Sequence, residues 1–163
     1  MLGGVTAVFE MPNTNPLTTS EAALADKVAR AMLAAEGTGP AWGIEIEEAR
    51  EGYARIRMTV RADMLNGHKT CHGGFIFALA DSTFAFACNS RNAPTVASGC
   101  TIDYLAPAFE GDVLTARAVE ASLAGRTGVY DIEVVNQNDK RVALFRGRSY
   151  RLNGTVLGGI EKK

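Results

Sequence analysis

A run of fourteen residues, from Phe75 to Cys88, constrains the fold of this chain more than any other segment. It reads FIFALADSTFAFAC and contains neither proline nor glycine. The run is too long for a typical strand, and its apolar residues would lie on most sides of a helix. We therefore predict a largely buried helix with one carboxylate, Asp81, in its middle.

A carboxylate is unexpected in a segment built for burial. An uncompensated buried carboxylate is costly, so such a group normally has a partner, a shifted pKa or a chemical role. Asp81 could pair with an arginine or cap another segment. It could also act as a general base or a nucleophile in a site that excludes bulk water. The residues alone leave both interpretations open.

The segment His72-Gly73-Gly74 stands at the predicted start of this helix. Amides of a helix's first turn lack backbone partners and point along the axis, at the positive end of the dipole. Glycine also lets a ligand approach the backbone closely. Such amides could stabilise a carbonyl oxygen that becomes an oxyanion. Alternatively, the two glycines only allow tight packing, and the sequence does not distinguish these explanations.

Helix geometry separates these two features. Eight residues from Gly73 to Asp81 correspond to about 12 Å at ~1.5 Å per residue. An oxyanion donor and an attacking group both lie within roughly 3 Å of the reacting centre. One helix spans this gap awkwardly, although an intervening water could shorten it. Two antiparallel helices from two subunits would bring each glycine beside the other chain's aspartate, so we expect a two-fold dimer with shared sites.

The remaining segments predict an α+β fold. Two paired strands are expected before the long helix, and four strand-like runs after it. Because no helical spacer lies between these four runs, we predict an antiparallel meander that wraps around the long helix. The predicted strands are residues 42–49, 52–62, 95–106, 112–122, 127–137 and 141–152.

The beginning of the chain lacks periodic patterns. We expect residues 1–20 to be an N-terminal extension, a candidate for disorder, and residues 21–160 to form one domain. A capping box with Thr18 as N-cap and Glu21 three residues later predicts a first helix, which ends near Gly37–Pro40.

Composition excludes several classes. The formal net charge of −1 offers no broad attraction to nucleic acid or acidic membranes. Three cysteines and two histidines, without a CxxC pair, argue against a disulfide framework and a metal site. With no secretory signal and no membrane span in the pattern, we expect a cytoplasmic protein that does not bind membranes.

Other reactive candidates are weaker. Cys71 beside His72 could form a nucleophilic pair, but neighbours in sequence need not be neighbours in space. Cys88 and Cys100 are predicted to be core residues. No G-x-S-x-G elbow or Walker A pattern occurs. Arginines of the C-terminal half, Arg126 among them, fit either a solvated sheet face or a landing site for a phosphorylated ligand.

The run LNGHKTCHGGFIFALADSTFAFACNS, followed by TIDYLAPAFEGDVLTARA, GVYDIEVVNQ and VALFRGRS, closely resembles the hotdog-fold acyl-CoA thioesterases, in particular the phenylacetic-acid-degradation (PaaI-type) thioesterases. The likeness covers roughly residues 22–157, and its N-x5-H-G-G-x6-D arrangement, from Asn66 to Asp81, is fairly specific. It implies a hotdog fold and hydrolysis of aryl-acetyl thioesters of coenzyme A, without metal or bound cofactor. Members are commonly tetramers of two dimers.

The resemblance also implies roles for single residues. Asp81 would activate water or attack the thioester carbonyl, and Gly73, together with Gly74, would supply the oxyanion amide. Asn66 and His72 match loop positions that orient the substrate and the site.

Related enzymes place a hydroxyl residue on the strand after the helix. Here Ser98 and Thr101 are the nearby hydroxyls and become candidate substrate contacts, while Ala97 holds the matching position.

Two other functions remain open at this point. One is a non-catalytic acyl-CoA binding or sensing module on the same fold, which would gain nothing obvious from a buried acid. The other is a hotdog dehydratase, but those enzymes resemble one another in an H-F-P-type loop, where this chain has Cys-His-Gly-Gly. The acyl group is not determined: Phe75, Phe77, Phe84 and Phe86 could line an aromatic pocket, but their helical spacing favours a place in the core.

Overall fold

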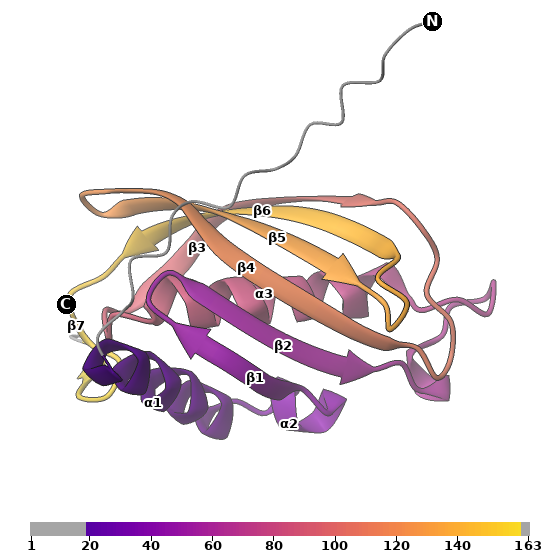
Figure 1. The fold of residues 1–163 in the computed structure, drawn as a ribbon, viewed down its shortest axis with the longest axis horizontal. Helices are drawn as coiled ribbons and strands as arrows, with labels where there is room; N and C mark the ends of the chain where they lie inside the picture. The colour runs from indigo at the N-terminus through magenta and orange to yellow at the C-terminus, as the bar shows by residue number, and fades with distance from the viewer. Residues whose placement is uncertain (1–18, 161–163) are drawn as a thin grey trace, which may run out of the picture.

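The computed structural model describes residues 19–160 as one antiparallel sheet wrapped around a long helix (Figure 1). The predicted N-cap, Thr18, and most of the predicted extension, residues 1–18, lie outside the described residues. The elements are α1 (Thr19–Ala35), α2 (Thr38–Trp42), β1 (Glu45–Arg50), β2 (Tyr53–Thr59), the short 3-10 helix η1 (Ala62–Met64), α3 (Gly73–Asn89), β3 (Thr95–Tyr104), β4 (Val113–Ala124), β5 (Thr127–Val135), β6 (Arg141–Arg151), β7 (Gly154–Thr155) and β8 (Gly159–Ile160).

The first predicted strand begins too early. Residues 38–42, expected as turn and strand, form α2, which ends at Gly43 with a φ of 71°. That left-handed conformation suits glycine and terminates the short helix, so β1 starts only at Glu45. The second predicted strand is correct up to Thr59, after which the chain turns into η1. The short hairpin of β7 and β8 is not foreseen in the sequence pattern.

The large sheet has the order β1-β2-β4-β5-β6-β3, with every neighbouring pair antiparallel. The predicted meander holds for β4, β5 and β6 but is wrong for β3, which lies beside β6 at the far edge. The connection of residues 105–112 explains the difference. It follows β3, and its Leu105 N–H still donates to Val142 O of β6. It then passes the residue before α3, where Cys71 N–H donates to Ala108 O, and reaches Val60, just after β2, through the Gly111 N–H.

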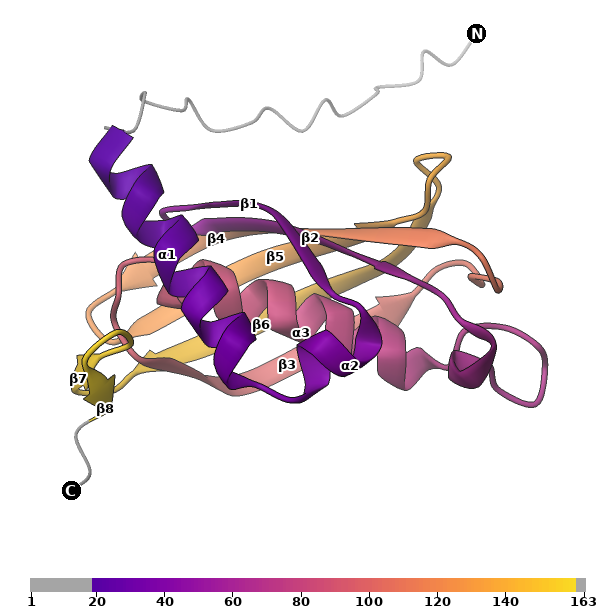
Figure 2. The same cartoon turned by 90° about the horizontal axis from the view of Figure 1, so that it is seen from below.

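Helix α3 runs along the inner side of this sheet, and α1 and α2 lie on the same side (Figure 2). Its side chains Leu79, Phe84 and Ala87 are buried against alternating residues of the strands, such as Ile56 and Met58 of β2. The prediction that this helix is buried on most sides is therefore confirmed. None of the helices in the part of the chain that the structure describes is long and apolar enough to cross a membrane.

A network of polar side chains anchors the end of α3. Arg91 follows the helix and forms ion pairs with Glu51 in the β1–β2 turn and Glu120 on β4. Tyr130 donates its hydroxyl to Glu120 at 2.7 Å, and Ser90 accepts the Gly52 N–H at 2.9 Å. These contacts hold the last turn of α3 against the sheet, so its direction relative to the strands is set at this end.

We expect Gly147→Ala to reduce the free energy of unfolding by about 1–3 kcal/mol, the usual cost of overpacking a core. A Cβ at Gly147 would lie 2.8 Å from Cγ of the buried Phe84 ring. Chemical denaturation measures the change. Gly37→Ala is the matched control, because a Cβ there meets no atom within 4 Å. An unfolding midpoint of Gly147→Ala equal to that of the control would contradict this close packing.

Candidate active site

The first turn of α3 presents one open amide. His72 is the N-cap residue, and its Nδ1 accepts the Gly74 N–H at 3.0 Å. The Phe75 N–H donates to His72 O at 2.9 Å. The Gly73 N–H makes no hydrogen bond within residues 19–160, so it is free to receive an acceptor at the positive end of the helix dipole. The Gly74 amide, predicted as a second donor, is already occupied.

The chain just before Gly73 is fixed by its backbone. The His72 N–H donates to Met64 O at 2.8 Å, and the Cys71 N–H is bonded to the connection between β3 and β4. Burial raises the pKa of the Cys71 thiol to about 11, and His72 uses its Nδ1 for capping. Both observations argue against a Cys71–His72 nucleophilic pair, because a thiol needs a lowered pKa to be reactive.

Asn66 organises the loop that leads to this point. Its Oδ1 accepts the His68 N–H at 2.9 Å and the Thr70 N–H at 3.3 Å, and its Nδ2 donates to Thr70 Oγ1 at 3.0 Å. The side chain thereby closes the loop in which Lys69 takes a positive φ of 61°. Asn66 is thus built into the loop, and a direct contact with substrate stays a prediction.

Asp81 lies half-buried on the side of α3 that the sheet leaves uncovered. The partly exposed helix residues on this side include the small Gly74, Ala78, Ser82 and Ala85, together with Phe77 one turn before Asp81. Burial raises the pKa of the Asp81 carboxyl, and a hydrogen bond from Cys100 opposes that shift. Asp81 takes part in none of the ion pairs found among residues 19–160, so pairing with an arginine of the same chain does not explain it.

Strand β3 brings an unexpected residue to Asp81. The Cys100 Sγ lies 3.9 Å from Asp81 Oδ1, and Cys100, predicted as a core residue, is partly exposed. Thr101 is exposed and pairs with Arg146, on the face of β3 that points away from the helix. Ser98 donates its hydroxyl to Arg148 O at 3.1 Å. The structure therefore does not bring Ser98 or Thr101 to Asp81 within one chain.

Arg126 stands at the opposite end of the sheet from Gly73. It lies in the turn between β4 and β5, and its guanidinium donates to Arg151 O at the end of β6 and to Asn153 Oδ1 just beyond. Arg151 pairs with Thr95, where the end of α3 is also held. A substrate bound at Gly73 of a chain would therefore not reach Arg126 of that same chain without extending along the whole helix.

The long helix separates the two central groups as expected. Helix α3 is continuous from Gly73 to Asn89, so Gly73 and Asp81 are about 12 Å apart along its axis. Within one chain, the open amide and the carboxylate therefore cannot both contact one thioester carbonyl.

Aromatic residues near Gly73 complete its surroundings. The Tyr104 hydroxyl donates to Gly73 O at 2.9 Å, and its ring lies so close that a Cβ on Gly73 would be 3.0 Å from Tyr104 Cζ. Phe75 packs edge-on against Trp42, with ring centroids 5.4 Å apart. Phe84 and Phe86 are core residues, whereas Phe75 and Phe77 are only partly buried. No local sequence signal distinguishes Tyr104 as a neighbour of Gly73 or Trp42 as a neighbour of Phe75.

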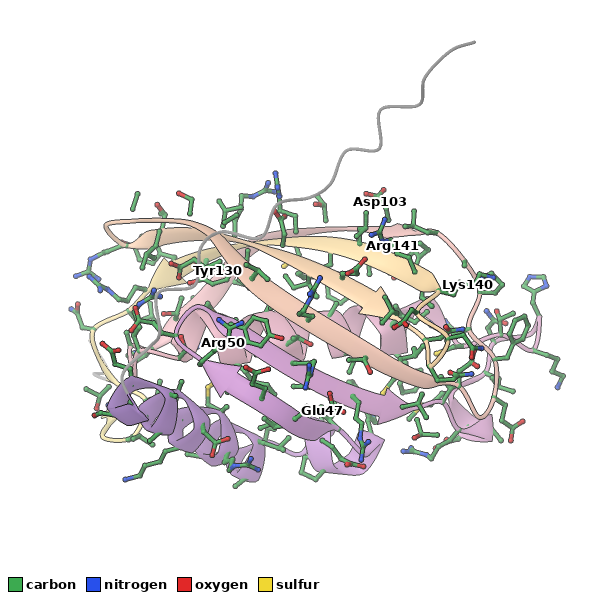
Figure 3. All side chains as sticks on the ribbon, viewed as in Figure 1. Glu47, Arg50, Asp103, Tyr130, Lys140 and Arg141 are labelled. Atoms are coloured by element: carbon green, nitrogen blue, oxygen red, sulfur yellow. The ribbon has the colours of Figure 1, made fainter. Side chains whose placement is uncertain are left out.

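A hollow of about 500 Å³ lies away from these groups, on the outer face of the sheet. Its lining includes Glu47, which is seen over β1 in Figure 3, together with Arg55, Arg117 and Glu133. These charges pair with one another across the strands. Within the described residues, no group of three His, Cys, Asp or Glu side chains could hold a metal ion. The candidate site is therefore the uncovered side of α3.

Comparison with known proteins identifies the family of the chain. The family model described as the thioesterase superfamily matches residues 68–143, which include the first turn of α3 and Asp81. The acyl-coenzyme A thioesterase PaaI of Escherichia coli K12 is 55% identical over 130 residues, which are 80% of this chain and 93% of that protein.

Solved structures support the same assignment. The E. coli PaaI protein from the phenylacetic acid degradation operon superposes with a TM-score of 0.82 at 52% identity, over 83% of this chain and 98% of that one. The Streptococcus mutans protein smu.793, solved with bound acetyl CoA, superposes with a TM-score of 0.66 at 25% identity, over 69% and 90% of the two chains. The predicted hotdog fold is confirmed, and the chain belongs to the thioesterase superfamily as a thioester hydrolase of the PaaI type.

Proposed function

We propose that this enzyme hydrolyses aryl-acetyl thioesters of coenzyme A, such as phenylacetyl-CoA or hydroxyphenylacetyl-CoA, without a metal or bound cofactor. The name and operon of the E. coli relative support the substrate class, and the acetyl CoA in the S. mutans structure supports a CoA thioester. The observation that carries the proposal is an acid without an ionic partner, Asp81, on the same exposed helix side as the open Gly73 amide.

The chemistry follows from these two groups. The Gly73 N–H would donate to the thioester oxygen and stabilise the negative charge that develops there. Asp81 would take a proton from water as the new carbon–oxygen bond forms, and would return it to the departing CoA thiolate when the carbon–sulfur bond breaks. Direct attack by the carboxylate, followed by hydrolysis of the resulting anhydride, is the other route that the same placement allows.

Each site would combine two chains. Strand β3 is an edge strand and can pair with a second copy, which would extend the sheet across both subunits. The small residues beside Asp81 would let a second α3 approach closely in the opposite direction. A two-fold axis near Phe77, midway between Gly73 and Asp81, would place Gly73 of each chain at Asp81 of its partner.

The same two-fold axis would also move Arg126 toward the partner's site. In antiparallel helices, the end of one α3 lies on the side of the other's first turn, and Arg126 stands at that end. The guanidinium would then be available to a phosphate of coenzyme A. Ser98 and Thr101, on the exposed β3, remain predicted substrate contacts at this seam. Two such dimers would form the tetramer common in the family.

We further propose that residues 21–160 are a single thioesterase domain, preceded by the extension over residues 1–20. A cytoplasmic location would fit the three cysteines, all of which are free thiols in the structure.

Asp81→Asn should lower kcat for phenylacetyl-CoA by on the order of 10²–10⁴-fold, the usual loss when a general base is removed. The release of CoA is followed with a thiol reagent, and substrate binding is measured separately. Wild-type protein that binds phenylacetyl-CoA without releasing CoA would instead indicate a binding module. Near-normal turnover by Asp81→Asn would exclude this residue as the base or nucleophile.

The same variant should be more stable than the wild type at neutral pH. Because burial raises the pKa of Asp81, the folded protein retains this proton to a higher pH than the unfolded chain. As far as this group is concerned, the wild-type protein therefore has its full free energy of unfolding at low pH, where the Asp81 carboxyl is protonated. It loses part of that free energy as the pH rises through the pKa of Asp81 in the folded state. The advantage of Asp81→Asn in thermal unfolding should shrink below about pH 4, the range of an unperturbed aspartate. A less stable variant at pH 7 would contradict this.

Phenylacetyl-CoA, or a ring-hydroxylated relative, should have a higher kcat/KM than palmitoyl-CoA. The partly buried Phe75 and Trp42 near Gly73 offer aromatic surface of limited size, which suits a ring better than a long chain. A panel of acyl-CoA substrates of rising length ranks the specificity. If the long chains come out on top, the proposed substrate class is wrong while the thioesterase activity stands.

Subunit mixing should restore activity between two inactive variants. Asp81→Asn chains are co-refolded with Gly73→Val chains, in which the new side chain would meet Tyr104 and block the amide. A mixed dimer has one site with both defects and one with neither. Random pairing makes half of the dimers mixed, so activity should approach about a quarter of wild type. If mixed dimers form but stay inactive, both residues serve the site of one chain.

A further inference from the structure

The Asp81 carboxylate has one side-chain partner within residues 19–160, the thiol of Cys100. The Sγ–Oδ1 distance of 3.9 Å falls within the range of a hydrogen bond to sulfur, in which the S–H is a weak donor. The contact leaves Oδ2 without a partner among these residues. One oxygen of the proposed base is therefore held from the strand, and the other is open.

A bulge in β3 produces this contact. The pairing with β6 shifts between Ala97 and Gly99, so that Ser98 is an extra residue. After the shift, Cys100 pairs with Gly147 and turns toward α3, whereas Thr101 turns outward. Bulges next to active sites often re-aim a side chain in this way. Without the extra residue, the alternation of β3 would carry Cys100 to the outer face.

The charged and titratable groups around the pair keep the thiol protonated. Burial and then the charge of Asp81 raise the pKa of Cys100, and Arg148 on β6 opposes that shift. On α3 itself, Cys88 faces the same region, and burial raises its pKa to about 12. Cys100 is therefore a neutral S–H donor at neutral pH rather than a nucleophile, and Cys88 contributes no charge.

We propose that Cys100 is a positioning residue for the thioesterase reaction: its thiol holds Asp81 Oδ1 and directs Oδ2 toward the reacting water or carbonyl. This inference rests on the role proposed above for Asp81. A weak neutral donor orients the carboxylate while leaving it basic, whereas an arginine in the same place would lower its pKa and its strength as a base.

Three variants test the inference. Cys100→Ala removes the donor and should lower kcat by about three- to tenfold, the size of one net hydrogen bond, with little change in KM. The acidic limb of the pH profile of kcat/KM should move to higher pH, since the thiol no longer favours the ionised carboxylate. Cys100→Ser restores a donor and should return both values toward wild type. Cys88→Ser, a matched thiol that does not bond Asp81, should leave the acidic limb in place.

A double variant separates this inference from the proposed function. In the Asp81→Asn background, Cys100→Ala should cause no further loss, because the thiol acts through the carboxylate. Thermal unfolding verifies that each variant is folded. An acidic limb that stays in place in Cys100→Ala, or an equal shift in Cys88→Ser, would overturn the positioning role while leaving Asp81 as the base. Full activity of Asp81→Asn alone would overturn the proposed function and this inference with it.

Discussion

The packing of α3 against only part of its circumference governs the rest of this structure. The helix is apolar on most sides, and the sheet covers the larger part of that surface. The packing is close, as the Phe84 ring of α3 lies directly against Gly147 of β6. What stays uncovered is a side of mostly small residues, with Phe77 and one carboxylate, Asp81. An exposed helix side of this kind favours a second helix, and the proposed shared site follows from the same geometry.

The start of α3 illustrates how a proposed oxyanion site can be built mainly from backbone. His72 caps the helix through its imidazole and thereby uses the Gly74 amide, which leaves the Gly73 amide as the open donor. Hydrogen bonds from the backbone of residues 71 and 72 to neighbouring segments fix the position of that amide. A donor held this way needs no reorganisation when charge develops on a bound carbonyl oxygen.

The burial of Asp81 costs stability but suits the proposed role of this residue as a base. Burial without an ionic partner raises its pKa and costs folding free energy, yet the same environment makes the carboxylate a better proton acceptor. The polar network at the other end of the helix, around Arg91 and Glu120, pairs every charge instead. The network at the end of the helix thus consists of paired charges, whereas Asp81 has no ionic partner within residues 19–160.

The amino-acid sequence by itself determined the long helix, most of the strand segments and the family, because periodicity, glycine positions and the family's motif are local properties. The pairing of the Gly73 amide with Asp81 stays a prediction. Only the tertiary structure decided that β3 lies beside β6, since the connection of residues 105–112 first crosses the start of α3. The bulge before Gly99 likewise turned Cys100, and not Thr101, toward the carboxylate. Register and strand order depend on contacts between distant segments, and no local pattern encodes them.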